Sequence, residues 1–239
     1  MTRAIILART LLFTLVFYLW SVTLCIVFLP LLLLPRQATL AAFRFWALGV
    51  FVILRVCHGV KVELRGREHM PTGRALIAAK HLCMFDVFAQ FAWLPDSCFV
   101  MRKELLRIPF FGWYARKVRM VVIDREGRVK ALQALVRAGR DRLSEPRQLV
   151  IFPEAHRGTP GVAGHYHPGV AALYRDLDMP VHLVATNSSI HWPTPGYLRP
   201  PGTIVFEYLE PLPAGLKRAD FMHQLEDRIE TASNALLSV

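Results

Sequence analysis

The sequence predicts an α/β fold: a mixed, largely parallel sheet covered by helices, preceded by an apolar helical anchor. After residue 60, short apolar runs rich in Val, Ile and Ala alternate with amphipathic stretches. Strands that are apolar throughout are typical of parallel sheets buried on both faces. Before residue 60 the chain carries two long apolar stretches. Its 239 residues suffice for one globular domain with an appendage.

The first apolar stretch, residues 10–34, contains no charged residue. As a helix it would span roughly 37 Å, enough to cross a hydrocarbon core of about 30 Å. No small-residue cleavage site follows it, which favours a retained segment over a signal peptide. Pro30 and Pro35 end the stretch. We expect a membrane anchor at residues 1–58 and a globular domain at residues 59–239.

The second apolar stretch, residues 40–57, carries Arg44 and Arg55. It either returns along the membrane interface as the second arm of a helical hairpin or forms a core helix of the domain. Both alternatives remain open. Arginines flank both ends of the first stretch, so the positive-inside rule gives no orientation for a single span. A hairpin with both ends on one side would explain this symmetry.

Seven strands and four helices are expected after residue 59, from the length and the period of each apolar pattern. The strands are predicted at residues 61–65, 75–79, 97–101, 120–123, 149–152, 181–186 and 204–208, and the helices at 85–94, 129–143, 169–177 and 218–236. No internal repeat or low-complexity tract interrupts this alternation.

A histidine and a carboxylate lie where the predicted strand 75–79 leads into the predicted helix 85–94. His81 and Asp86 are five positions apart, and a turn at residues 82–84 lets the carboxylate fold back onto the imidazole. In α/β folds such strand ends are where ligands bind. A neutral histidine oriented by a carboxylate is a general base. The plain alternative is a histidine that caps a helix, and Cys83 alone is weak evidence for a nucleophile.

Two further polar groups follow predicted strands. Arg125 comes two positions after the predicted strand at residues 120–123, where its fork of donors is well placed for an anionic ligand. Glu154 and Arg157 follow residues 149–152, three positions apart, so they either brace each other or bind a phosphate and a hydroxyl. The Gly/Pro-rich loop at residues 158–168 carries His165 and His167, and it is a candidate for a mobile flap.

The composition points to a membrane surface. The chain is 54% hydrophobic and has a formal net charge of +11. A basic protein with an apolar end suits an anionic membrane. The basic residues are dispersed and no basic run with interleaved aromatics is present, which argues against nucleic acid as a partner. Four widely spaced cysteines indicate no disulfide framework and fit a reducing, cytosolic setting.

These motifs together resemble the four sequence blocks of the glycerolipid acyltransferases, and most closely the bacterial 1-acyl-glycerol-3-phosphate acyltransferases. The blocks are His81-x4-Asp86, then Phe-Phe-Gly-Trp with Ile-Asp-Arg125, then Phe-Pro-Glu-x-x-Arg157, then Pro-Val with an apolar strand. They occur in the order and rough spacing of that family, over about residues 60–208. The apolar N-terminal anchor also suits the family.

The resemblance implies a role for each matching residue. His81 would deprotonate the free glycerol hydroxyl and Asp86 would orient it. Arg125, Glu154 and Arg157 would bind the glycerol phosphate. Apart from the resemblance, the sequence does not identify the donors to the oxyanion; Lys80, as a further substrate-binding residue, and backbone N–H groups near the turn are our candidates.

The resemblance also implies the partners of the chain. The donor would be acyl-CoA or acyl carrier protein, with no metal and no cofactor. The product would be phosphatidic acid, made at the cytosolic face of a bacterial inner membrane.

One departure leaves the acceptor open. The third block of the family usually reads Phe-Pro-Glu-Gly-Thr-Arg, whereas this chain has Ala155-His156 in place of Gly-Thr. Within the same chemistry the acceptor could be glycerol 3-phosphate or a lyso-ornithine lipid. Two other classes are a metal-dependent lipid hydrolase that uses His165 and His167 and a non-catalytic, lipid-binding membrane protein.

Overall fold

One seven-stranded sheet organises the part of the chain that is described in this computed structural model, residues 3–124, 127–193, 196 and 198–239. Its order is β1-β7-β6-β2-β5-β3-β4. The strands are β1 (Val60–Arg65), β2 (Ala75–Ala79), β3 (Ser97–Arg102), β4 (Val121–Ile123), β5 (Gln148–Ile151), β6 (Val181–Thr186) and β7 (Gly202–Leu212). Strands β6, β2, β5, β3 and β4 run parallel, whereas β7 is antiparallel to β6 and β1 is parallel to β7. The predicted mixed, largely parallel sheet is confirmed.

The two strands at the centre of the sheet, β2 and β5, are buried along their whole length. In register, Ala78 of β2 lies between Ile151 of β5 and Leu183 of β6. Because these three strands are parallel, their carboxyl ends meet at one edge of the sheet. The residues that follow β2, β5 and β6 are therefore brought together there.

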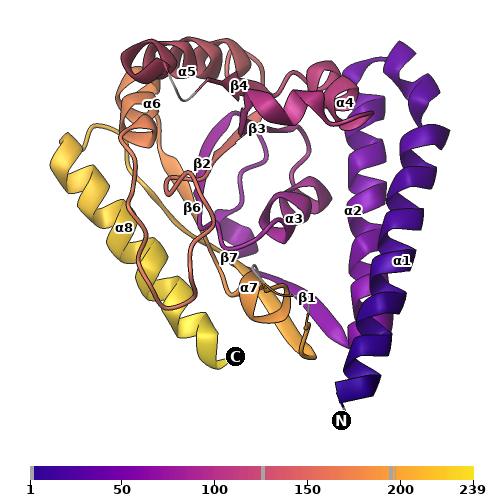
Figure 1. The fold of residues 1–239 in the computed structure, drawn as a ribbon. Coiled ribbons are helices and arrows are strands. Elements are labelled where there is room, and N and C mark those ends of the chain that lie inside the picture. Colours follow the sequence, from indigo (N-terminus) through magenta and orange to yellow (C-terminus); the bar gives the residue numbers. More distant parts are fainter. Residues whose placement is uncertain (1–2, 125–126, 194–195, 197) are drawn as a thin grey trace.

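Helices cover both faces of the sheet (Figure 1). On one side lie α5 (Arg128–Arg142), α6 (Gly169–Leu177) and α8 (Arg218–Ala235), and on the other lie α2 (Arg36–His58) and α3 (Phe85–Trp93). Two short helices, α4 (Phe111–Lys117) and α7 (Ser188–His191), were not expected from the sequence, since so few residues show no period. Gly112 lets α4 approach the preceding turn, because a Cβ there would overlap the Leu106 carbonyl oxygen.

The N-terminal segment is a helical hairpin. Helix α1 (Arg3–Val27) leads through the 3₁₀ turn η1 (Leu29–Leu33) into α2. The hairpin lies along the domain over its length (Figure 1). The Tyr114 hydroxyl donates to the Cys25 carbonyl at 2.8 Å near one end, and the rings of Phe13 and Trp192 are 5.4 Å apart near the other.

Charged side chains fix the start of α2 to the domain. Arg36 bonds Asp96 at 2.6 Å and Glu145 at 2.7 Å, and Asp96 also accepts a bond from the buried Arg147 at 2.9 Å. The guanidinium of Arg147 is buried, and its ion pair with Asp96 offsets the cost of burying this charge.

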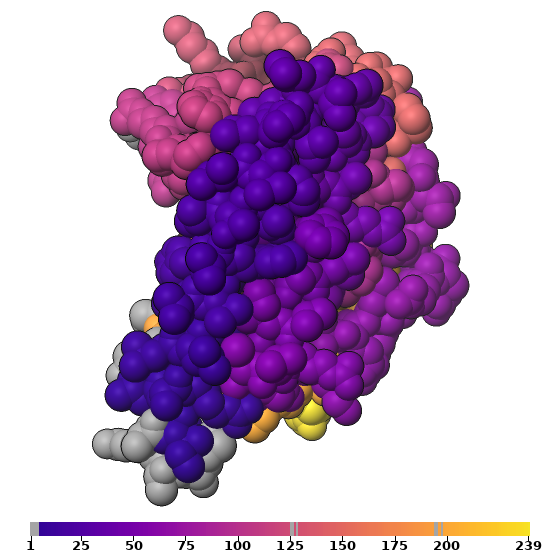
Figure 2. All heavy atoms as spheres, turned by 90° about the vertical axis from the view of Figure 1, so that its right-hand side faces the viewer, coloured from indigo at the N-terminus to yellow at the C-terminus, as the bar shows by residue number. Residues whose placement is uncertain are grey.

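The outer face of the hairpin is exposed (Figure 2), and its exposed residues are largely apolar. Leu11, Leu15, Leu19, Val22 and Ile26 of α1, and Leu48, Val52 and Val56 of α2, are all exposed large apolar residues. By length and composition Ile5–Val27 and Arg36–His58 are both able to cross a membrane, and 22% and 33% of their most apolar windows are buried. Helix α2 is the second arm of the hairpin, and it also packs on the domain through residues such as Val50 and Leu54.

Candidate active site

The turn between β2 and α3 brings Asp86 onto His81, as the spacing predicted. The Nδ1 atom of His81 lies 3.1 Å from Oδ2 of Asp86, and Asp86 is only 1% exposed. An ionised carboxylate only accepts, so Nδ1 carries the proton and Nε2 keeps its lone pair. The imidazole is thus held in the tautomer that a base requires.

The Asp86 carboxylate is saturated with donors. Its Oδ2 atom also accepts the backbone N–H groups of Leu82 at 2.6 Å and Cys83 at 2.8 Å. Its Oδ1 atom accepts the hydroxyl of Ser188, the first residue of α7. Ser188 was missed in the sequence, because a serine 102 positions from Asp86 has no local signal.

The imidazole of His81 remains within reach of a ligand. Its side chain is 16% exposed, and its ring stacks on that of Phe152 with centroids 4.2 Å apart. Phe152 directly follows β5, so the neighbouring strand supplies a flat apolar support for the ring. This support and Asp86 together set the direction of Nε2.

Lys80 and Glu154 are buried, in contrast to the expectation that they contact a substrate. Their side chains are 2% and 0% exposed, and Nζ of Lys80 lies 2.8 Å from Oε1 of Glu154. The same ammonium lies 2.6 Å from Oε1 of Glu230 in α8, and Oε1 of Glu230 accepts the Tyr166 hydroxyl at 2.9 Å. A ligand that approaches His81 therefore meets neither residue in this structure.

The expected oxyanion donors are also occupied. The His81 N–H donates to Oε2 of Glu154 at 3.3 Å, and the next two N–H groups donate to Asp86. With Lys80 already bonded to two carboxylates, these groups stabilise the turn. Burial of a charged group is tolerated because each one is paired.

Arg157 stands apart from this network. Its side chain is exposed, and within the described residues it forms no ion pair, so the predicted brace with Glu154 does not form. The next residue, Gly158, donates its N–H to the His81 carbonyl at 2.7 Å, which places Arg157 beside the His81 turn. Arg125 lies outside the described residues; β4, which precedes it, ends at the same edge of the sheet.

The loop at residues 158–168 packs over Glu154. A Cβ on Gly158 would lie 2.9 Å from Oε1 of Glu154, and Gly164 approaches the same carboxylate still more closely. The rings of His165 and His167 are 4.9 Å apart. Across the described residues, however, no three or more His, Cys, Asp or Glu are arranged to hold a metal ion, so the metal-dependent alternative gains no ligand set there.

Cys83 lies inside the turn as a neutral thiol. Burial, and secondly the nearby Asp86 carboxylate, raise the pKa of this thiol well above its ordinary value. Its sulfur contacts the Ser188 hydroxyl oxygen at 3.3 Å. Because the thiolate is the reactive form of cysteine, Cys83 is a poor nucleophile.

Ala155 adopts a backbone conformation that favours glycine. Its φ angle is +59° in the position where the family usually has glycine. A Cβ in the left-handed region costs roughly 1 kcal/mol. The substitution therefore keeps the path of the backbone toward Arg157 and adds strain.

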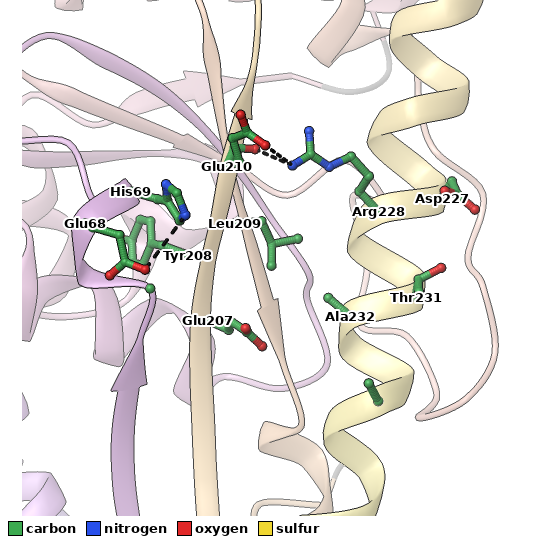
Figure 3. Close-up of a pocket in the computed structure, with 12 residues that line it drawn as sticks. Glu68, His69, Glu207, Tyr208, Leu209, Glu210, Asp227, Arg228, Thr231 and Ala232 are labelled. Carbon is green, nitrogen blue, oxygen red and sulfur yellow. Dashed lines mark hydrogen bonds and ion pairs between the residues drawn. The ribbon is translucent and has the colours of Figure 1, made fainter.

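A cavity lies elsewhere, away from His81 and Asp86 (Figure 3). It has a volume of about 430 Å³ and lies between β7 and α8. Its lining includes the acidic side chains of Glu68, Glu207, Glu210 and Asp227, and none of the predicted site residues.

Comparison with protein families assigns the chain to a class of enzyme. Residues 61–186 match the family model described as Acyltransferase, and the chain belongs to the acyltransferase family. This confirms the resemblance to the bacterial glycerolipid type.

Two enzymes and one solved structure are similar to this chain. The chain is 32% identical over 168 residues to the 1-acyl-sn-glycerol-3-phosphate acyltransferase of Pseudomonas aeruginosa, a match over 69% of this chain and 65% of that protein. It is 35% identical over 111 residues to the lyso-ornithine lipid O-acyltransferase of Rhodobacter capsulatus, over 43% of this chain and 37% of that protein. The fold matches the crystal structure of the 1-acyl-sn-glycerophosphate (LPA) acyltransferase PlsC from Thermotoga maritima, with a TM-score of 0.81 over 98% of both chains and 20% identity.

Replacing Ala155 by glycine is expected to raise the free energy of unfolding by about 0.5–1 kcal/mol, because the strained φ of +59° is relieved. Thermal unfolding in detergent measures the change. The matched control is Ala163→Gly in the same loop, which relieves no positive φ and is expected to be neutral or destabilising. Equal effects of the two substitutions would contradict the strain at Ala155.

Proposed function

We propose that the chain transfers a fatty acyl group from acyl-CoA or acyl carrier protein to the free hydroxyl of 1-acyl-glycerol-3-phosphate, giving phosphatidic acid. The observation that carries this proposal is the His81 imidazole, whose Nδ1 is bound to Asp86 and whose ring remains accessible. The match to the Pseudomonas enzyme of that name supports the substrate class.

The reaction needs one base and no covalent intermediate. Nε2 of His81 accepts the proton of the acceptor hydroxyl while its oxygen attacks the carbonyl carbon of the thioester. The tetrahedral intermediate collapses with cleavage of the C–S bond, and the imidazolium returns its proton to the leaving thiolate. Asp86 stabilises the imidazolium, and base catalysis of this kind typically contributes about 10²–10⁴-fold.

The acceptor phosphate is assigned to the arginines. Arg157 is exposed beside the turn and has a free guanidinium within the described residues, and such a group binds phosphate through paired donors. Arg125 is proposed as a second phosphate ligand on the evidence of its sequence motif alone. Glu154 and Lys80 are proposed to hold the His81 turn rather than to bind the acceptor, because both are buried.

The hairpin is proposed to anchor the enzyme in one leaflet of the bacterial inner membrane, with the site facing the cytosol. Because α1 and α2 pack along the domain, a hairpin that crossed the bilayer would draw the domain into the hydrocarbon. One that lies in the interface exposes only its apolar outer face to lipid. This placement brings the site close to its lipid substrates.

A lyso-ornithine lipid is the second candidate acceptor, because the match to the Rhodobacter enzyme reaches 35% identity. Glycerol 3-phosphate is a further alternative within the same chemistry. A panel of the three acceptors with one acyl-CoA separates them, since kcat/KM identifies the preferred acceptor.

Substituting His81 by alanine is expected to lower kcat by about 10²–10⁴-fold, because the base is lost while Asp86 keeps its backbone donors. The measurement is transfer of a radiolabelled acyl chain from acyl-CoA to 1-acyl-glycerol-3-phosphate. His223→Ala, at an exposed position of α8, is the control and should keep full activity. Activity of His81→Ala within threefold of wild type would remove His81 from the base role.

Substituting Arg157 by alanine is expected to raise KM for 1-acyl-glycerol-3-phosphate by about 10-fold or more, since a charge-assisted pair with the phosphate is lost. KM for acyl-CoA should stay unchanged. Arg175→Ala, an exposed arginine of α6, serves as the control. An unchanged KM for the phosphorylated acceptor would rule out Arg157 as its ligand.

Two glutamates on the outer face of α1, in Leu15→Glu with Leu19→Glu, are expected to shift much of the protein from the membrane pellet to the supernatant. Val129→Glu, at an exposed apolar position of α5, is the control. A separate experiment tests the topology of the hairpin. The Leu33→Cys variant, which carries its thiol at the exposed hairpin turn, is treated with a maleimide that cannot cross the membrane. Labelling from the periplasmic side would show a spanning hairpin and defeat the one-leaflet proposal.

A further inference from the structure

Glu230 is a buried carboxylate without an assigned role. It lies in α8, near the end of the chain, and is 8% exposed. Its Oε1 atom lies 2.6 Å from Nζ of Lys80 and 2.9 Å from the Tyr166 hydroxyl. The contact to Lys80 joins residues 150 positions apart.

Charge balance does not require this carboxylate. Lys80 already pairs with the fully buried Glu154 at 2.8 Å. With all three groups ionised, one ammonium faces two carboxylates, and the cluster carries one net negative charge. Burying an excess charge is costly, so a residue of this kind needs a compensating reason.

Tyr166 keeps the second carboxylate in place. Burial, and then the neighbouring Glu230, raise the pKa of this phenol, so it stays a neutral donor. Tyr166 belongs to the loop at residues 158–168, so one hydrogen bond connects that loop with α8. The carboxylate of Glu230 is thereby fixed between two elements.

The cluster acts on the backbone of the catalytic turn. Lys80 directly precedes His81, and the second oxygen of Glu154 accepts the His81 N–H at 3.3 Å. Asp86 holds the imidazole from the α3 side. The turn is therefore held on one side by Asp86 and on the other by the cluster of Lys80, Glu154 and Glu230.

We propose that Glu230 is a positioning residue for the proposed acyl transfer. It holds Lys80 and Glu154 so that the His81 turn keeps its geometry. Its negative charge also stabilises the imidazolium that forms when His81 takes the proton of the acceptor. The inference rests on the proposed function, and it assigns the C-terminal helix a part in the chemistry.

Several other titratable groups surround His81 and enter its pH dependence. The turn and α3 contribute Cys83 and Asp86, the residue after β2 is Lys80, and the segment after β5 contributes Glu154 and the exposed Arg157. The same segment contributes the exposed His156, and the loop at residues 158–168 contributes Tyr166 and the exposed His165 and His167. Of the described carboxylates, Asp86, Glu154 and Glu230 form the two buried networks at this turn.

The test is Glu230→Gln, which keeps the shape and the acceptor oxygen and removes the charge. We expect kcat to fall roughly threefold to tenfold, with KM for both substrates unchanged. The acid limb of the pH–rate profile should move to lower pH by about half a unit, because the imidazolium loses a favourable charge. The matched control is Glu226→Gln, one helical turn earlier and exposed, where solvent screens the charge.

Two further results decide the inference. Glu230→Ala should lower both kcat and the midpoint of thermal unfolding. Glu230→Gln should have the wild-type unfolding midpoint, but the acid limb of its pH–rate profile should remain shifted from that of wild type. Wild-type activity with an unchanged kcat and acid limb in Glu230→Gln would overturn the positioning role and leave the proposed function intact. A wild-type protein that transfers no acyl chain to any acceptor of the panel would defeat the proposed function itself.

Discussion

The Asp86 carboxylate is the interaction on which the candidate site depends. It accepts two backbone N–H groups of the β2–α3 turn, the Ser188 hydroxyl and Nδ1 of His81. These donors fix the position of the carboxylate, and the carboxylate fixes the orientation of the imidazole. Because the donors come from the turn and from α7, the tautomer of His81 is set before any substrate binds.

A second buried network supports the turn from the opposite side. Lys80 directly follows β2, Glu154 lies in the segment after β5, and Glu230 lies in α8. Only these strand ends and α8 together complete the cluster, so the C-terminal helix and the sheet must both be in place before the site is rigid. Preorganisation of this kind is what a base needs, since a small displacement of its nitrogen sharply reduces the rate.

Local patterns in the sequence predicted most of the fold and half of the site. All seven strands and the contact of His81 with Asp86 follow from apolar runs and a five-residue spacing. Ser188 and Glu230 could not be predicted, because their partners lie 102 and 150 positions away. Lys80 and Glu154 were expected to bind the substrate; instead they pair with each other, and this pairing allows them to be buried. Arg125 lies outside the described residues.

The burial of Glu154 bears on how Ala155-His156, which replace the usual Gly-Thr of the third sequence block, affect the site. Ala155 keeps the left-handed backbone with a φ of +59°, and Nδ1 of His156 contacts the Glu154 carbonyl oxygen. Neither change touches the carboxylate of Glu154, which stays bonded to Lys80 and to the His81 N–H. The effect of the departure therefore falls on Arg157, whose backbone follows directly. In the proposed function the exposed Arg157 binds the acceptor phosphate, so we expect this departure to affect headgroup binding and to leave His81 and Asp86 as they are.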